Sequence, residues 1–248
     1  MDGEIILMFF LGLLGNFIGT LAGGGGLLTL PAMIIFNTPV QVGIGANKFS
    51  TGIASFTNVI YLWKNKFFSI NLIIQIIIYG FIGGVIGALI TTSLNEKILN
   101  ITVIILLLTA LFLTLIKPSK ENNGITEEIK SSLKLKIIDF FVGIYNGGFG
   151  PGSATFGIIL YMREGIRYVQ SARMARILIF GSNFGAFIIF YQSGYIYWHI
   201  TIPLAIGAIT GAQIGMYVLP KIPQELARKL LIGITLLLII QVSLKLFS

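Results

Sequence analysis

The segment Gly19-Thr20-Leu21-Ala22-Gly23-Gly24-Gly25-Gly26-Leu27-Leu28-Thr29-Leu30-Pro31 interrupts an apolar stretch that runs from Ile5 to Phe36. As one straight helix this stretch would be about 48 Å long at ~1.5 Å per residue, longer than the ~30 Å hydrocarbon core of a bilayer. Because glycine is the poorest helix former apart from proline, we expect the helix to break at Gly23–Gly26. Irregular backbone at membrane depth is tolerated only where it is buried in protein or lines a polar cavity.

The composition of the whole chain is that of a membrane protein. Of its 248 residues 55% are hydrophobic and 10% are charged, and the mean hydropathy is +0.92, whereas soluble domains carry about a quarter charged residues. Five stretches are almost free of charge: Ile5–Leu14, Leu72–Ile90, Ile98–Ile116, Thr201–Leu219 and Leu230–Leu244. We therefore expect an all-α polytopic protein of the cell (cytoplasmic) membrane. Acidic Asp2 and Glu4 precede the first stretch, so we expect no cleaved signal peptide.

The net charge and the absence of cysteine narrow the function classes. A net charge of +8 in a membrane protein indicates basic loops that face the cytoplasm and anionic lipid, so we expect no nucleic acid as a partner. The chain has no cysteine, which excludes disulfides and thiolate metal sites. We expect no cofactor and no metal site.

The two halves of the sequence resemble each other. Residues 1–116 and 137–248 flank a charged stretch at 117–136, which we interpret as a cytoplasmic loop between two transmembrane repeats. Three landmarks recur in order, 128 to 131 residues apart: Phe9-Phe10-Leu11-Gly12 and Phe140-Phe141-Val142-Gly143, Val40-Gln41 and Val169-Gln170, Gly83-Gly84-Val85-Ile86-Gly87 and Gly211-Ala212-Gln213-Ile214-Gly215. Chance recurrence of Gly and Phe in an apolar chain is the alternative. Internal duplication is a common plan of transporters.

The second half has its own break at Asn146-Gly147-Gly148-Phe149-Gly150-Pro151-Gly152-Ser153. If the segment Asp139–Met162 turns back to its own side, twelve basic loop residues lie on one side of the membrane and two on the other; if it crosses, the division is eight to six. Only the first arrangement agrees with the positive-inside rule. Each half would then be a re-entrant glycine-rich hairpin plus three transmembrane helices, and an odd number of spans inverts the second repeat.

Three basic residues lie within apolar segments: Lys48, Arg173 and Arg176. A charge there costs ~2.5–3.5 kcal/mol and usually faces a polar interior, and we see no acidic residue inside a span to neutralise it or to relay protons. Cations beside freed backbone amides favour an anion. The alternative is that these side chains reach the lipid headgroups. The predicted substrate-binding residues are Gly23, Gly24, Gly25, Gly26, Lys48, Asn58, Gly150, Gly152, Ser153, Arg173, Arg176 and Asn183.

Other features have simpler interpretations. Glycines spaced by three or four, such as Gly83, Gly87, Gly211 and Gly215, suit close helix packing. His199 lies beside Tyr197 and Trp198 and is expected at the membrane interface. Sequence signatures of hydrolases, zinc proteases and nucleotide-binding loops are missing, so the protein is not expected to be an enzyme.

The glycine run leading to Pro31, followed by Pro39 and by Ala46-Asn47-Lys48 at a helix start, resembles the sulfite exporter TauE/SafE family of membrane permeases. In that family each half opens with a glycine-rich stretch leading to a proline. The second half departs from the pattern, because it reads Gly148-Phe149-Gly150-Pro151-Gly152-Ser153 with no later proline at the matching place. The resemblance implies passage of sulfite, an organosulfonate or a related sulfur-containing or organic anion.

The sequence as a whole therefore predicts a secondary transporter of a small anion that works by alternating access. An anion channel, and a membrane partner subunit that transports nothing, are the alternatives. The expected partners are a small anionic substrate and the lipid bilayer, and a homo-oligomer is compatible with the sequence.

Overall fold

The computed structural model describes residues 2–22, 25–95, 98–99, 101–102, 105, 108, 112, 129, 131–221, 226, 229, 233 and 236. Gly23, Gly24, most of the predicted loop 117–136 and most of the apolar stretches Ile98–Ile116 and Leu230–Leu244 lie outside these residues. The described part of the chain is all helical, with no strand: α1 (Asp2–Ala22), α2 (Gly26–Ile35), α3 (Val40–Lys64), α4 (Ile70–Ser93), α6 (Leu133–Gly148), α7 (Ser153–Arg163), α8 (Tyr168–Gln192) and α9 (Trp198–Val218).

Helix length separates the spans from the half-length helices. The helices α1, α4, α8 and α9 are long and apolar enough to cross a bilayer, which makes the chain a multi-pass membrane protein. The helix α3 is as long as α8, at 25 residues, but it is not apolar enough to be counted with these four. The helices α2 and α7 have 10 and 11 residues. At ~1.5 Å per residue they are only about half as long as a crossing requires.

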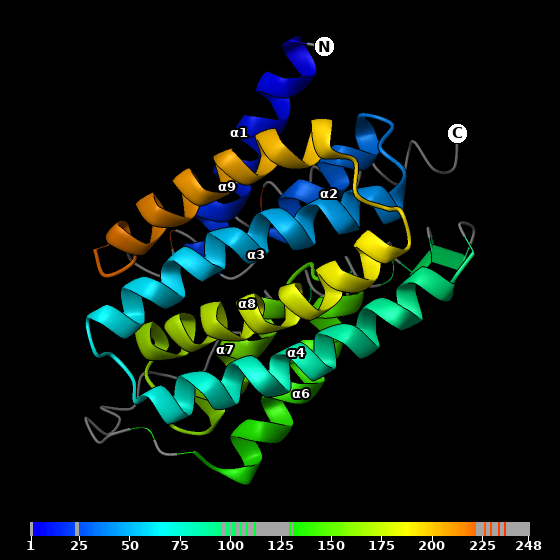
Figure 1. The fold of residues 1–248 in the computed structure, drawn as a ribbon. Coiled ribbons are helices and arrows are strands. Elements are labelled where there is room, and N and C mark those ends of the chain that lie inside the picture. The colour runs from blue at the N-terminus through cyan, green and yellow to red at the C-terminus, as the bar shows by residue number, and fades with distance from the viewer. Residues whose placement is uncertain are drawn as a thin grey trace.

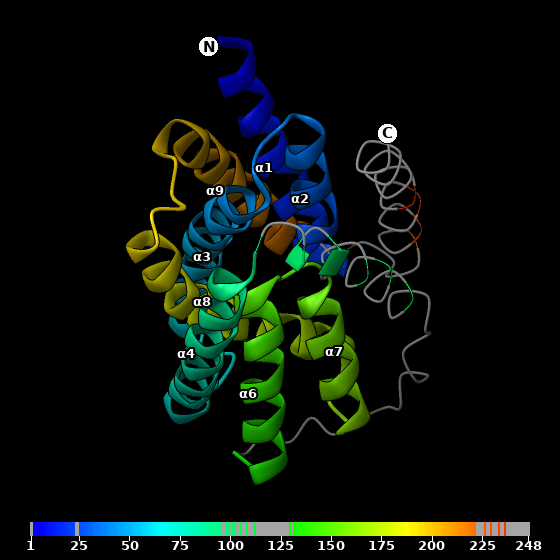
Figure 2. The ribbon, with the colours of Figure 1, turned by 90° about the vertical axis from the view of Figure 1, so that its right-hand side faces the viewer.

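Both predicted breaks are confirmed. The first separates α1, which ends at Ala22, from α2, which begins at Gly26. The second separates α6, which ends at Gly148, from α7, which begins at Ser153. In Figure 2, α1 descends from the N-terminus and α2 turns back upward beside it, whereas α6 rises from the opposite end and α7 turns back downward. Each break therefore forms the tip of a helical hairpin, and the two tips point toward each other.

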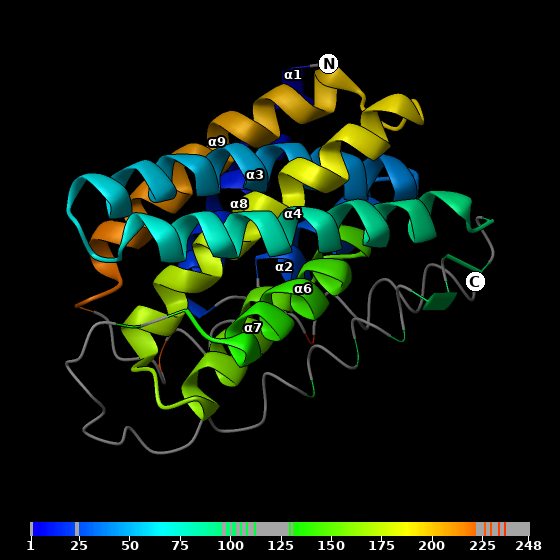
Figure 3. The same ribbon diagram turned by 60° about the horizontal axis from the view of Figure 1, so that its bottom comes forward.

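Four long helices form a layer between the hairpins. Figure 1 shows them in the order α9, α3, α8, α4, and each neighbouring pair is in contact. The helix α1 packs on α9 at one edge of the layer, and α6 packs on α4 at the other; Figure 3 shows the hairpin of α6 and α7 beneath α4. The helices α9 and α4 are thus each packed against the hairpin of the other half of the chain.

Glycines allow this close approach, as the sequence predicted. On α9, a Cβ atom added to Gly207 or Gly211 would overlap the backbone of α1. The glycines of α4 form two rows rather than one face, because Gly83 and Gly87 lie against the backbone of α6, whereas Gly80 and Gly84 lie against α8. Small residues of this kind bring helix backbones together where lipid supplies no hydrophobic drive.

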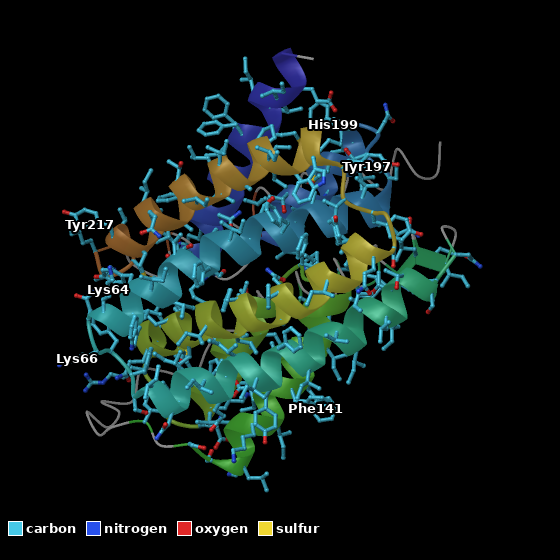
Figure 4. All side chains as sticks on the ribbon, viewed as in Figure 1. Lys64, Lys66, Phe141, Tyr197, His199 and Tyr217 are labelled. Atoms are coloured by element: carbon cyan, nitrogen blue, oxygen red, sulfur yellow. The ribbon has the colours of Figure 1, made fainter. Side chains whose placement is uncertain are left out.

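The two ends of the layer carry different residues. Figure 4 shows Lys64, Lys66 and Tyr217 at one end, and Tyr197 and His199 at the other. The rings of Tyr197 and His199 lie 6.0 Å apart and both side chains are exposed. His199 is therefore placed at an outer end of the helices and away from the hairpin tips.

Candidate functional site

The site lies where the two hairpin tips meet. Gly26 begins α2 and abuts Gly150 and Pro151 between α6 and α7: a Cβ atom on Gly26 would lie 3.1 Å from the Cα of Pro151. Beside this contact is a polar cavity of about 30 Å³, which has room for one or two water molecules. Its lining residues come from both halves of the chain: Asn16, Gly19, Gly25, Gly26, Asn47, Lys48, Thr51, Asn146, Gly150, Ser153, Arg176, Ile179 and Asn183.

Lys48 enters the cavity from α3. Its side chain is 3% exposed, and its ammonium group donates a hydrogen bond to the backbone carbonyl of Asn146. Asn146 is in the last turn of α6, where carbonyl groups lack helical partners and the helix end is partially negative. Gly150 has φ +93°, and a Cβ atom there would lie 2.7 Å from the Lys48 Nζ. The backbone conformation therefore favours glycine at this position, and an added methyl group would displace the end of the Lys48 side chain.

Arg176 makes the same kind of contact from α8. It is 3% exposed, and its Nη2 donates to the carbonyl of Gly19, which is in the last turn of α1. The hydroxyl of Tyr168 donates to the carbonyl of Leu21 in the same turn. The Arg176 Nε is buried and has no hydrogen-bond partner among the described residues. Arg176 thus holds the tip of the first hairpin and retains one unused donor.

Asn146 organises the second tip through its side chain. Its Nδ2 donates to the Oγ of Ser182 and to the Oδ1 of Asn183 at 2.8 Å, and its Oδ1 accepts from the Oγ of Ser153 at 2.6 Å. The side chain therefore joins α6 to both α7 and α8. At the first tip, Asn47 donates to the Oγ1 of Thr29 at 2.8 Å and so joins α3 to α2.

The cavity contains seven of the predicted substrate-binding residues: Gly25, Gly26, Lys48, Gly150, Ser153, Arg176 and Asn183. Gly152 lies next to it in the left-handed conformation (φ 75°), at the N-cap of α7. Asn58 is buried further along α3, where its Oδ1 accepts from Gln213 of α9 at 3.4 Å. Arg173 is half-buried, and its guanidinium lies 3.8 Å from the ring centroid of Phe67. Neither Asn58 nor Arg173 lines the cavity.

Sequence reasoning missed Asn16, Gly19, Asn47 and Asn146, although Asn146 stands in the second break and Asn47 precedes Lys48. It also overlooked a buried acidic residue on α6, which is a helix of the second hairpin and not one of the four long apolar helices. Asp139 of α6 is 0% exposed. Its carboxyl group accepts from the hydroxyl of Tyr161 at 2.5 Å and from the Nε2 of Gln75 at 3.3 Å.

A second and larger cavity of about 430 Å³ opens beside the polar one, between α3 and α8. Its walls are largely phenylalanine, including Phe49, Phe56 and Phe184, whereas Lys48 and Asn183 line both cavities. Among the residues that the structure describes, no three His, Cys, Asp or Glu side chains gather as metal ligands would. The groups that the polar cavity offers to a solute are hydrogen-bond donors and the two cations Lys48 and Arg176.

The sequence is similar to a family of membrane proteins and to several individual membrane proteins. The sequence model of the family described as sulfite exporter TauE/SafE matches residues 8–242. A "probable membrane transporter protein" of Haemophilus influenzae is 26% identical over 212 residues, which cover 85% of this chain and 83% of that protein. The "probable membrane transporter protein YfcA" of Escherichia coli is 26% identical over 230 residues, covering 91% and 84%.

One comparison found nothing: no solved structure matches the chain. The match to the family extends over nearly the whole sequence and takes in both breaks, Lys48 and Arg176. The chain belongs to the sulfite exporter TauE/SafE family.

Proposed function

We propose that the protein is a secondary transporter that carries a small anion, such as sulfite or an organosulfonate, through the polar cavity between the hairpin tips. One observation carries the proposal: Lys48 and Arg176, from different halves of the chain, line one buried cavity, and the Nε of Arg176 has no hydrogen-bond partner in the described part of the chain. A buried donor without a partner costs about 1–3 kcal/mol. An oxyanion in the cavity would use that donor together with the free N–H groups of Lys48.

Alternating access follows from where the two cations bind. Each holds a carbonyl group at the tip of the opposite half's hairpin. The cavity of about 30 Å³ holds only one or two water molecules, so an anion enters only when the tips move apart. An anion that attracts both cations competes with the two carbonyl groups and loosens one tip or the other. Binding and the opening of the site are linked in this scheme.

The repeat organisation belongs to the same proposal: residues 1–116 and 137–248 are inverted repeats joined by a cytoplasmic loop at 117–136. The packing supports it, because the contacts of α1 with α9 and of α3 with α9 correspond to those of α6 with α4 and of α8 with α4. The opposite directions of the two hairpins in Figure 2 support it as well. Transporters built from inverted repeats bind their substrates where broken helices meet.

The test is counterflow of radiolabelled sulfite in proteoliposomes that hold purified protein. The variants are Arg176→Gln and its matched control Arg173→Gln, which changes the same residue type one turn earlier on α8, outside the cavity. We expect saturable counterflow in the wild-type protein, a loss of at least tenfold in Arg176→Gln, and a change of less than twofold in the control.

Equal losses in the two arginine variants would remove the proposed site. Flux that does not saturate and shows no counterflow would indicate a channel. No flux of sulfite, organosulfonates or small carboxylates in the wild-type protein would contradict transport itself and favour a partner subunit.

A further inference from the structure

A second polar cluster, away from the cavity, joins α6 to α7 and α4. It consists of Asp139, Tyr161 and Gln75. Tyr161 donates to the Oδ1 of Asp139, at 2.5 Å, and the Nε2 of Gln75 donates to the Oδ2 at 3.3 Å. The exposed fractions of Asp139, Tyr161 and Gln75 are 0%, 0% and 8%. The carboxyl group is therefore shut off from both sides of the protein in this conformation.

No cation compensates this carboxyl group among the described residues, where the one salt bridge joins Lys134 to Glu164. On α6 and on the described helices packed against it, the remaining titratable side chains are Lys134, Lys136 and Tyr145 of α6, Arg163 of α7, Tyr79 of α4, and Tyr168, Arg173, Arg176 and Tyr191 of α8. None of these makes a hydrogen bond or ion pair with Asp139, and Arg173 and Arg176 are engaged with Phe67 and Gly19. An ionised carboxylate away from water is costly without a cation.

Gln75 makes the cluster suitable for two protonation states. Its Oε1 is buried and has no hydrogen-bond partner among the residues that the structure describes. When Asp139 is ionised, the amide group donates to the Oδ2, as observed. When the Oδ2 carries a proton, a turn of the same amide places the vacant Oε1 as its acceptor. A glutamine offers a donor and an acceptor on one flat group, so the carboxyl group keeps a partner in either state.

The fold itself does not require polar residues at this place. The repeats pair α6, α7 and α4 with α1, α2 and α9, and Asp139 with Met8. Met8, Met33 and Leu204, which come from those three helices, form a buried apolar cluster. Methionine and leucine fill the space in one half, whereas the other half places three hydrogen-bonding side chains there. Packing therefore does not explain the cluster, and a proton-binding role does.

We propose that Asp139, Tyr161 and Gln75 form a proton-binding site that couples the anion's movement to that of a proton. The inference rests on the proposed transport function. Asp139 lies seven residues before Asn146 on α6, two turns or ~10 Å along the same side of the helix. Binding or release of the proton at the Oδ2 changes how α4 holds the second hairpin, whose tip carries the carbonyl bound by Lys48. Because the carboxyl group is sealed here, the proton exchanges with water only in another conformation of the cycle.

The experiment compares two readouts of sulfite transport in the same proteoliposomes. Counterflow at equal pH reports exchange of the anion, and accumulation driven by a pH gradient reports coupling. The test variant is Asp139→Asn, which keeps the shape of the side chain and the acceptor for Tyr161, and which can donate to the Oε1 of Gln75 once that amide turns, but carries no titratable proton. The matched control is Asn183→Asp, which places a carboxyl group at the polar cavity instead.

We expect the wild-type protein to accumulate sulfite in a pH gradient and Asp139→Asn to lose that accumulation at least tenfold, with counterflow kept within about threefold. We expect Asn183→Asp to lose counterflow and accumulation together. Counterflow in the wild-type protein without any effect of the gradient would overturn the coupling and leave the transport function standing. No counterflow in the wild-type protein would overturn the transport function and the coupling with it.

An infrared titration of the purified protein tests the proton site directly, so the proposal can be checked even if a variant fails to fold. We expect a carboxyl band that changes with pH in the wild-type protein and disappears in Asp139→Asn. Asp139→Met, which copies Met8, is the second variant and should remove the same band while the helices stay folded. A wild-type spectrum that shows no titrating carboxyl band assignable to Asp139 would overturn the proposal whatever the flux shows.

Discussion

Lys48 and Arg176 hold matching positions and make matching contacts: each reaches from a long central helix of its own half to a carbonyl group in the last turn of the other half's first hairpin helix. The two residues lie 128 apart, within the range of offsets that relates the other landmarks. A cation near the C-terminal end of a helix is favourable, and more so where the site is partly dry. The two contacts tie the halves together at the tips.

Loss of the Lys48 contact should lower stability. In Lys48→Met the carbonyl group of Asn146 would keep its burial and lose its donor, which costs about 1–3 kcal/mol. We expect a lower midpoint of thermal unfolding in detergent. Lys64→Met, at the exposed end of the same helix, is the control and should leave the midpoint within the error. An unchanged midpoint in Lys48→Met would contradict the contact.

Close packing at Gly84 should make even one methyl group harmful. A Cβ atom there would overlap the backbone of Ser182 on α8, and added volume in a packed interior costs typically ~1–3 kcal/mol. We expect Gly84→Ala to unfold at a lower temperature than the wild-type protein. Gly3→Ala places the same methyl group where nothing lies within 4 Å. Equal midpoints for the two variants would show that α4 and α8 are further apart.

Gly152 should be sensitive to substitution because of its backbone conformation. Its φ of 75° is left-handed, which costs a residue with a side chain roughly 1–2 kcal/mol. We expect Gly152→Ala to reduce both the unfolding midpoint and the rate of sulfite counterflow, because the N-cap of α7 adjoins the cavity. Gly157→Ala is the matched control on α7, where the nearest atoms would lie 3.7 Å from the new methyl group. A larger effect in the control would be evidence against this role.

Topology can be read by cysteine labelling, because the native chain has no cysteine. We expect Lys66→Cys and Arg163→Cys to react with a membrane-impermeant maleimide from one side of the membrane, and His199→Cys to react from the other. Unlabelled native protein is the background control. Reaction of Lys66→Cys and Arg163→Cys from opposite sides would rule out the return of α7 to the side from which α6 enters.

Local chemistry made much of the fold predictable. Glycine is the poorest helix former apart from proline, so the breaks at Gly23–Gly26 and between Asn146 and Ser153 could both be placed from the sequence. The spaced glycines of α4 and α9 signalled close packing because no side chain fills their positions. Lys48 and Arg176 stood out because the cost of charge in a membrane requires an explanation for each.

What escaped prediction depended on tertiary contacts. The partners of Lys48 and Arg176 are backbone carbonyl groups some 98 and 157 residues away, and no side-chain pattern marks a carbonyl. Asp139 was overlooked because it lies only six residues from the start of α6. So close to the end of a helix, the sequence alone suggests an acidic side chain that is exposed to water. Asn58 lies ten residues from Lys48 on α3, ~15 Å further along the helix, which is why one helix carries both but only Lys48 reaches the cavity.

The close backbone contacts between α1 and α9 and between α4 and α6, called seams here, suggest how such a chain could arise in evolution. Each seam pairs a helix of one half with a helix of the other. A chain cut between α4 and α6 would leave two fragments with glycine rows facing lipid, and in neither fragment would the described helices cover those rows. We expect each fragment to need the other, or a second copy of itself inserted in the opposite sense, before it forms a stable bundle. A half-length ancestor of this chain would have been a dimer from the beginning.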